Sequence, residues 1–120
     1  MDKVLIERDE RVFIITVNRP EKHNCIDGEV ASMLEDAWLE FRDDEELYVA
    51  VITGAGDDTF CSGADLEALD TLGLPPETSA QRARWFVTHG PGYIGYSRGV
   101  DIYKPIIGAI NGYALAGGLE

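Results

Sequence analysis

The order of apolar runs along the chain restricts its fold more than any other feature. Residues 4–6 and 12–17 are rich in β-branched side chains and are separated by a charged stretch, so they predict a β-hairpin. A helix is predicted next, with Asp27 as its N-cap, because apolar side chains then recur at steps of three and four. The predicted stripe consists of Val30, Met33, Leu34, Ala37, Trp38 and Phe41. Residues 48–53 are apolar throughout, as in a strand covered on both faces, and the order strand, strand, helix, strand predicts an α/β fold.

The second half of the chain is predicted to be more interrupted. A glycine-rich turn is expected next, then a short strand or loop entering a helical turn, then a flexible connection; these occupy residues 54–58, 59–69 and 71–77. A helical region beginning near Ser79 is predicted to break at Gly90-Pro91-Gly92. A buried strand is predicted over residues 106–110, and a glycine-rich turn and the first residues of a helix follow it to Glu120.

The last predicted helix is too short to be stable by itself. A helix needs about a dozen residues, or tertiary support, before it is stable in water. We therefore interpret the end at Glu120 as a truncation. Residues 1–120 are expected to be the N-terminal part of one domain whose C-terminal helical part is absent.

The charge balance excludes some classes of partner. The chain has 22 acidic and 10 basic residues, a formal net charge of −12, which repels nucleic acids and anionic lipid surfaces. An anionic ligand would therefore depend on local cations. No signal peptide or membrane-spanning run is recognisable, and Cys25 and Cys61 lack the spacing of a metal site. We expect a cytoplasmic protein with two reduced, packed thiols and no metal.

Two glycine-bearing segments could present backbone N–H groups to a ligand. In residues 60–65 small side chains allow a ligand to approach the main chain, and in residues 112–120 a strand turns into a helix start. The N–H groups of a helix start lack partners within the helix and carry partial positive charge. Two such donors aimed at one point would form an oxyanion hole, in which each is worth about 3 kcal/mol. Either segment by itself is also compatible with tight packing and no catalytic role.

Five blocks of the sequence, in this order, resemble the successive signatures of the crotonase superfamily, which includes enoyl-CoA hydratases and isomerases. The blocks are Asn18-Arg19-Pro20-Glu21-Lys22-His23-Asn24, Val51-Ile52-Thr53-Gly54, Phe60-Cys61-Ser62-Gly63-Ala64-Asp65, Lys104-Pro105-Ile106 and Asn111-Gly112-Tyr113-Ala114-Leu115-Ala116-Gly117-Gly118. The resemblance implies a spiral of ββα repeats, a coenzyme A thioester as substrate, no separate cofactor, and assembly as trimers or dimers of trimers. It also implies that the thioester oxygen is held by the N–H groups of Ala64 and Gly117.

The same resemblance assigns residues that would line the coenzyme A channel. They are Lys22, Cys25, Ala64, Asp65, Leu66, Gly117 and Gly118. Lys22, with Arg19 nearby, could meet the phosphates of coenzyme A, although an exposed lysine commonly has no specific partner. Asp65 is interpreted as a structural hydrogen-bonding residue of its loop rather than as a base.

Glu120 falls where hydratases of this family carry one of two catalytic glutamates. A carboxylate at this position could orient and deprotonate water, although a glutamate in the first turn also complements the helix dipole. The second glutamate would lie beyond residue 120. The leading hypothesis is an enoyl-CoA hydratase that adds water to a trans-2-enoyl-CoA. The alternatives are a carnitinyl-CoA dehydratase or enoyl-CoA isomerase, and a non-catalytic acyl-CoA-binding fragment or pseudoenzyme.

Several aromatic and imidazole side chains receive weaker interpretations. Trp38 is expected in the core and both histidines, His23 and His89, on the surface. Trp85 and Phe86 could belong either to the core or to an acyl pocket. In many relatives the segment before Lys104 is a plain amphipathic helix, whereas here residues 89–103 contain glycines and tyrosines. We expect Tyr93 and Tyr96 there to influence acyl-chain preference.

Overall fold

A computed structural model describes residues 1–72, 78, 80–81 and 100–120 of the chain. The predicted hairpin is confirmed: β1 (Val4–Asp9) and β2 (Val12–Val17) are antiparallel, with Val4 opposite Val17. Glu10 turns the chain between them with a positive φ of 53°. Along β2 the side chains alternate between buried and half-buried, because successive residues of a strand point to opposite faces.

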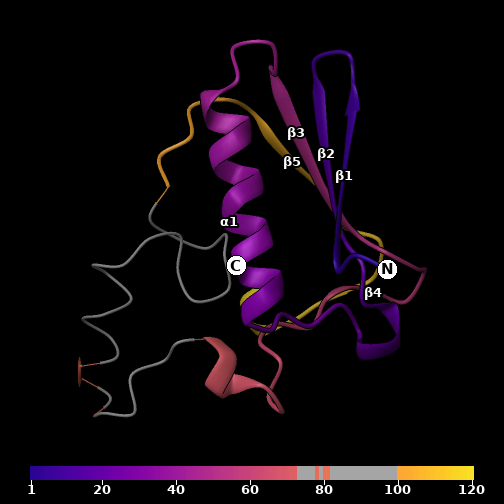
Figure 1. The fold of residues 1–120 in the computed structure, drawn as a ribbon. Coiled ribbons are helices and arrows are strands. Elements are labelled where there is room, and N and C mark those ends of the chain that lie inside the picture. Colours follow the sequence, from indigo (N-terminus) through magenta and orange to yellow (C-terminus); the bar gives the residue numbers. More distant parts are fainter. Residues whose placement is uncertain (73–77, 79, 82–99) are drawn as a thin grey trace.

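The predicted helix is also confirmed, as α1 (Gly28–Asp43), which lies alongside the sheet (Figure 1). Asp27 is its N-cap and accepts a hydrogen bond of 2.9 Å from Val30 N. Five members of the predicted stripe are buried: Val30, Leu34, Ala37, Trp38 and Phe41. Met33 is half-buried and packs against the same core. The Phe41 ring stacks on Phe13 of β2 with 6.0 Å between ring centroids, which joins helix and sheet.

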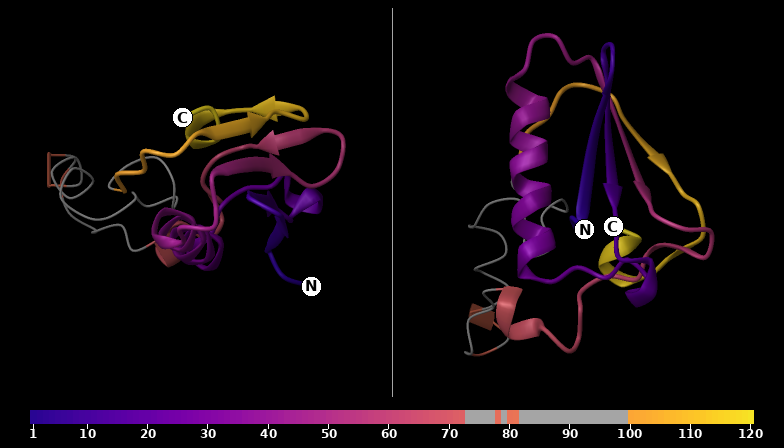
Figure 2. Two further views of the ribbon diagram at one scale, coloured as in Figure 1. Left: turned by 90° about the horizontal axis from the view of Figure 1, so that it is seen from above. Right: turned by 45° about the vertical axis from the view of Figure 1, so that its right-hand side comes forward.

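The remaining strands extend the hairpin into a four-stranded sheet and form a second, two-stranded sheet. β3 (Val49–Gly54) lies parallel to β2, and β5 (Ile106–Ala109) lies parallel to β3, in the order β1-β2-β3-β5. After β3 and after β5 the chain adds one strand each to a smaller sheet, in which β4 (Thr59–Cys61) and β6 (Tyr113–Ala114) are parallel. Seen from above, the chain steps outward from the hairpin through β3 to β5 (Figure 2). The α/β prediction is correct.

The burial predicted for two of the strands is wrong. Residues 48–53 were expected to be covered on both faces, but in β3 the buried residues Ala50 and Ile52 alternate with half-buried ones. Residues 106–110 were expected to be a buried strand, yet every residue of β5 is exposed. Among the described residues β5 pairs only with β3, so one of its edges and much of its surface face solvent.

The end of the chain also differs from the prediction. The last residues up to Glu120 were expected to begin a helix, whereas the structure has a 3₁₀ turn, η3 (Ala116–Gly118). Two further 3₁₀ turns are present, η1 (Pro20–Lys22) and η2 (Leu69–Leu72). Trp38 is in the core and His23 is exposed, both as predicted. The predictions for Ser79, the glycine break at residues 90–92, Trp85, Phe86, His89, Tyr93 and Tyr96 fall outside the described residues.

None of the helices in the described ranges is both long and apolar enough to cross a membrane.

Lys104 connects the C-terminal end of α1 to the start of β5. Its ammonium group donates to the carbonyl oxygens of Phe41 (2.6 Å) and Asp44 (2.7 Å), and lies 5.0 Å from the centre of the Phe41 ring. These carbonyls end the helix and carry its partial negative charge.

Replacing Lys104 with Met is expected to lower the free energy of unfolding by about 1–3 kcal/mol, measured by urea denaturation. Lys22→Met, at an exposed ion pair with Glu67, is the control and should change stability little.

Candidate functional site

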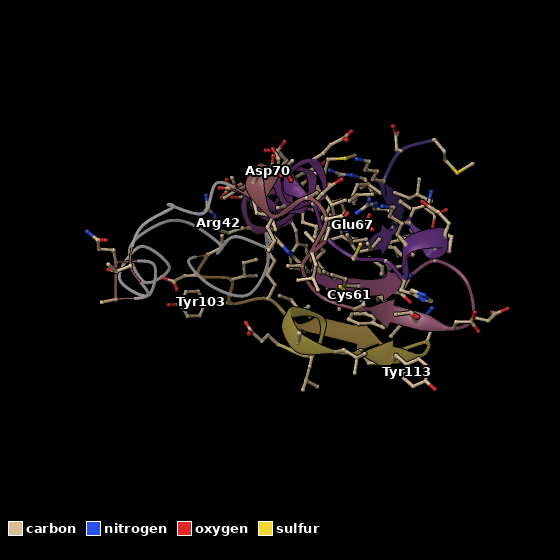
Figure 3. The ribbon with its side chains drawn as sticks, turned by 90° about the horizontal axis from the view of Figure 1, so that it is seen from below. Arg42, Cys61, Glu67, Asp70, Tyr103 and Tyr113 are labelled. Carbon is tan, nitrogen blue, oxygen red and sulfur yellow. The ribbon has the colours of Figure 1, made fainter. Side chains whose placement is uncertain are left out.

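Three backbone segments lie side by side at the end of the sheet where β3 and β5 finish. The middle segment is residues 59–65, which we call the central strip. On one side it bonds to residues 23–26: Ser62 N donates to His23 O at 3.1 Å. On the other side it bonds to residues 113–118: Leu115 N donates to Cys61 O at 3.0 Å. Figure 3 shows Cys61 in the interior and Tyr113 on the outer side of this arrangement.

The pairing of Ile26 with the central strip fixes the direction of the Ala64 amide. Ile26 N donates to Gly63 O and Asp65 N donates to Ile26 O, both at 2.8 Å, which is the pattern of a parallel bridge between Ile26 and Ala64. In a parallel ladder one residue bonds to the two neighbours of its partner, so the partner's own N–H and C=O point to the opposite edge. The Ala64 N–H therefore faces away from Ile26, toward the side occupied by residues 113–118.

Gly63 and Gly118 allow the central strip and the terminal turn to meet. A methyl group on Gly63, whose φ is 97°, would lie 3.1 Å from Gly117 N and 3.2 Å from Ala116 Cβ. A methyl group on Gly118 would overlap the carbonyl group of Cys61. Ala116 holds the turn in a left-handed conformation, with φ at 50°, which is uncommon for a residue with a side chain. The structure thus brings the Ala64 and Gly117 peptides into neighbouring positions.

A buried ion cluster lies beneath residues 23–26 and the central strip. Arg19 donates to Asp65 Oδ2 at 3.1 Å and lies 3.6 Å from Asp27 Oδ2, and all three side chains are at most 10% exposed. Burial raises the pKa of Asp65. Its hydrogen bonds from Arg19 and from Glu67 N, with the positive charge of Arg19, outweigh burial and hold that pKa below its usual value. Asp65 is thus a structural residue of its loop, as predicted, and stays ionised.

Cys25 and Lys22 differ in their surroundings, although both belong to the predicted channel. Cys25 is buried, and burial raises the pKa of its thiol despite the opposing charge of Arg19. It is therefore protonated at neutral pH, and both cysteines are packed thiols as predicted. Lys22 is exposed at the end of η1 and pairs with Glu67 at 2.9 Å.

Leu66 and Glu120 are exposed, in contrast to the glycines. Leu66 follows the central strip and is 81% exposed. Gly117 and Gly118 are buried in η3. Glu120 lies two residues after η3, and its backbone N donates to Ala116 O at 3.4 Å. Ala64, Asp65, Gly117 and Gly118 are therefore brought together at the junction of two segments, with Lys22, Cys25 and Leu66 in the segments that border it.

Sequence reasoning missed the two asparagines that hold the loops of this region. Asn24 accepts from Arg19 N and donates to the carbonyls of Ala55 and Thr59. Asn111 accepts from Gly54 N and donates to Gly54 O at 2.7 Å. Asn24 has a φ of 54°, in the left-handed region that asparagine tolerates better than most residues. The sequence did contain a signal for each residue. Asn24 follows a proline-containing turn, and Asn111 follows the strand predicted over residues 106–110.

Arg19 was missed as the centre of a buried cluster, because an arginine next to a proline also fits an exposed turn. Among the described residues, no three His, Cys, Asp or Glu side chains are placed so that they could hold a metal ion.

Comparison with known proteins gives one family. The sequence profile described as enoyl-CoA hydratase/isomerase matches residues 7–120. The chain is 38% identical to (E)-benzylidenesuccinyl-CoA hydratase of Thauera aromatica over 117 residues, which are 98% of this chain and 42% of that protein. It is 38% identical to carnitinyl-CoA dehydratase of Salmonella arizonae, over 99% of this chain and 42% of that protein.

A solved structure is similar over the same region. It is a probable enoyl-CoA hydratase/isomerase from Mycobacterium abscessus, with a TM-score of 0.76 and 38% sequence identity, and the match covers 98% of this chain and 41% of that chain. The present chain therefore spans about two fifths of the length of these relatives.

The contact between η3 and the central strip predicts a large effect of a single methyl group. Gly118→Ala would force the Cys61 carbonyl and the turn apart, and we expect a loss of about 1–3 kcal/mol in the free energy of unfolding. The matched control is Gly108→Ala in β5, where the added methyl meets only the flexible end of Ile110, at 3.1 Å. Urea denaturation of both variants measures the difference. Equal stability of the two variants would contradict the close packing of Gly118 on Cys61.

Proposed function

The chain belongs to the enoyl-CoA hydratase/isomerase family, and on that premise we propose that it is part of an enoyl-CoA hydratase that adds water to a trans-2-enoyl-CoA. In this proposal the N–H groups of Ala64 and Gly117 hold the thioester oxygen. The observation that carries it is the close approach of Gly63 to Gly117 N, together with an Ala64 N–H that faces the same side. The two donors come from segments about fifty positions apart, which only the tertiary structure brings together.

The proposed reaction places negative charge where these donors are. Water oxygen bonds to Cβ of the enoyl group and loses a proton to a base. The π electrons move toward the thioester oxygen, which becomes an enolate oxygen until Cα accepts a proton. Two preorganised N–H donors stabilise that enolate more than the neutral thioester, so they lower the barrier to addition. No metal or redox cofactor is required in this scheme, since the coenzyme A is part of the substrate.

Glu120 is proposed as one of the acid/base residues. It lies three positions after Gly117, directly beyond the turn that contains Gly117, and it is exposed. A carboxylate there can orient the attacking water beside the polarised thioester. The resemblance places a second acid/base glutamate later in the chain than residue 120.

The coenzyme A moiety is proposed to pass along Lys22, Cys25, Asp65 and Leu66, and over the glycines of η3. In a chain of net charge −12 the nucleotide phosphates need a local cation, and Lys22 is exposed beside the central strip. Its pair with Glu67 is at the surface, where such pairs are worth little, so the lysine can exchange partners at small cost. Leu66 offers an exposed apolar contact. Cys25 and Asp65 are buried and would shape the channel from below.

The relatives favour one alternative within the same chemistry. One similar protein is named a carnitinyl-CoA dehydratase, and removal of water from a 3-hydroxyacyl-CoA is the reverse of the proposed addition. An isomerase, or a protein that binds acyl-CoA without turnover, would use the same donors without activated water. Turnover of an enoyl-CoA and of its hydrated product would distinguish these possibilities. We also propose assembly as a trimer or a dimer of trimers, as in this family.

The role of the Ala64 N–H can be tested by removing this N–H group while the side chain is kept. Replacing Ala64 with lactic acid converts its amide into an ester, which lacks the N–H and leaves the Asp65 N bond to Ile26 O in place. We expect kcat for enoyl-CoA hydration by the intact protein to fall about 10²- to 10³-fold. The matched control is the same replacement at Ala68, whose N–H bonds to Asp65 O within its own loop. A kcat at position 64 equal to that of the Ala68 control would refute the proposed donor.

The role of Glu120 is tested separately. Glu120→Gln keeps the size and polarity of the side chain but removes its basicity. We expect a loss of about 10²-fold or more in turnover, followed as the decrease in absorbance of the conjugated thioester. Binding of a saturated acyl-CoA should be unchanged in this variant. Turnover near that of the unmodified protein would show that Glu120 is not an acid/base residue.

A further inference from the structure

Arg19 connects the two backbone segments that carry Ile26 and Ala64. Its side chain is 9% exposed, and its two terminal nitrogens bind different segments. Nη1 donates to Cys25 O at 2.8 Å, and Nη2 donates to Asp65 Oδ2 at 3.1 Å. Cys25 precedes Ile26 and Asp65 follows Ala64, so in this parallel pairing the guanidinium connects opposite ends of the bridge between Ile26 and Ala64.

The arrangement uses properties that only arginine has. Its planar group directs several N–H donors along fixed, diverging lines, whereas lysine offers one compact ammonium group. The charge of Arg19 is matched by Asp65 and by Asp27 at 3.6 Å, and Asp27 also accepts from Lys3 at 2.7 Å. The cluster is therefore balanced, and each carboxylate is held in one orientation.

We infer that Arg19 is a positioning residue that sets the angle of the Ala64 N–H toward the thioester oxygen. This inference rests on the proposed function. The peptide groups on both sides of Ala64 are bonded to Ile26, through Gly63 O and Asp65 N. The Asp65 side chain holds the second of these peptides against rotation, because Arg19 binds its carboxylate and Glu67 N donates to it at 3.1 Å. Arg19 acts through these groups and does not touch the substrate.

The experiment compares carbonyl polarisation with turnover in the intact protein. The probe is butanoyl-CoA labelled with ¹³C at the thioester carbonyl, a saturated thioester that cannot be hydrated. Its infrared carbonyl stretch should move to lower wavenumber on binding, since donors at the oxygen weaken the C=O bond. In Arg19→Lys we expect at least half of that displacement to be lost. We also expect a kcat for enoyl-CoA hydration at least about tenfold lower, with KM changed less than about threefold.

Arg8→Lys is the matched control. Arg8 also binds two carboxylates, with Nη1 2.8 Å from Asp44 Oδ2 and Nη2 2.6 Å from Glu40 Oε1, but on the exposed side of α1. The same loss of a forked donor there should leave the carbonyl stretch and kcat unchanged. A purely structural role of Arg19 would lower the thermal stability and the active fraction of Arg19→Lys without moving the carbonyl band of the bound probe.

The outcomes separate the two proposals. No displacement of the carbonyl stretch in the unmodified protein would overturn the proposed oxyanion donors, and the inference about Arg19 with them. A displacement in the unmodified protein that Arg19→Lys retains in full would overturn only the inference about Arg19. If Arg19→Lys does not fold, Asp65→Asn gives the same readout, because it keeps the shape of the side chain but removes the ion pair. A full displacement in that variant would also overturn the inference.

Discussion

The bridge between Ile26 and the residues on either side of Ala64 is the interaction on which the rest of the site depends. It pairs Gly63 O and Asp65 N on one edge of the central strip, so the Ala64 amide must face the other edge. The terminal turn lies at that other edge, because Leu115 N bonds to Cys61 O and Gly118 packs on Cys61. Backbone pairing of three segments thus determines which peptide groups can meet a ligand.

The large sheet provides the frame for this pairing. β3 and β5 are parallel and adjacent, so the segments that follow them leave the sheet at the same end and run side by side as β4 and β6. The asparagines at these exits satisfy the carbonyls and amides that the sheet no longer pairs, including Ala55 O and Thr59 O at Asn24. Beneath the central strip the contact is polar: the buried side chain of Arg19 lies against the carboxylates of Asp27 and Asp65. Such a buried cluster commonly contributes little net stability, and we propose that this one fixes orientation.

The last segment of the chain exposes several large apolar side chains. Ile106, Ile107, Tyr113 and Leu119 are each more than two fifths exposed, whereas the hairpin, α1 and β3 enclose a complete apolar core. Glu120, the proposed acid/base residue, is also exposed. The described residues therefore provide the main-chain part of the proposed site in an ordered form.

The sequence by itself determined the hairpin, α1 and the order of the strands, because their signals are local: the stripe after Asp27 and the alternation in residues 12–17. Family resemblance added the roles proposed for Ala64, Gly117 and Glu120, which periodicity could not give. The exposure of β5 was predicted wrongly, because an apolar run reports the composition of a strand and not whether anything covers it. The tertiary structure alone decided the direction of the Ala64 amide and the partners of Arg19. The bridge between Ile26 and Ala64 and the pair between Arg19 and Asp65 join segments about forty positions apart, and no local pattern encodes which edge of a strip is already paired.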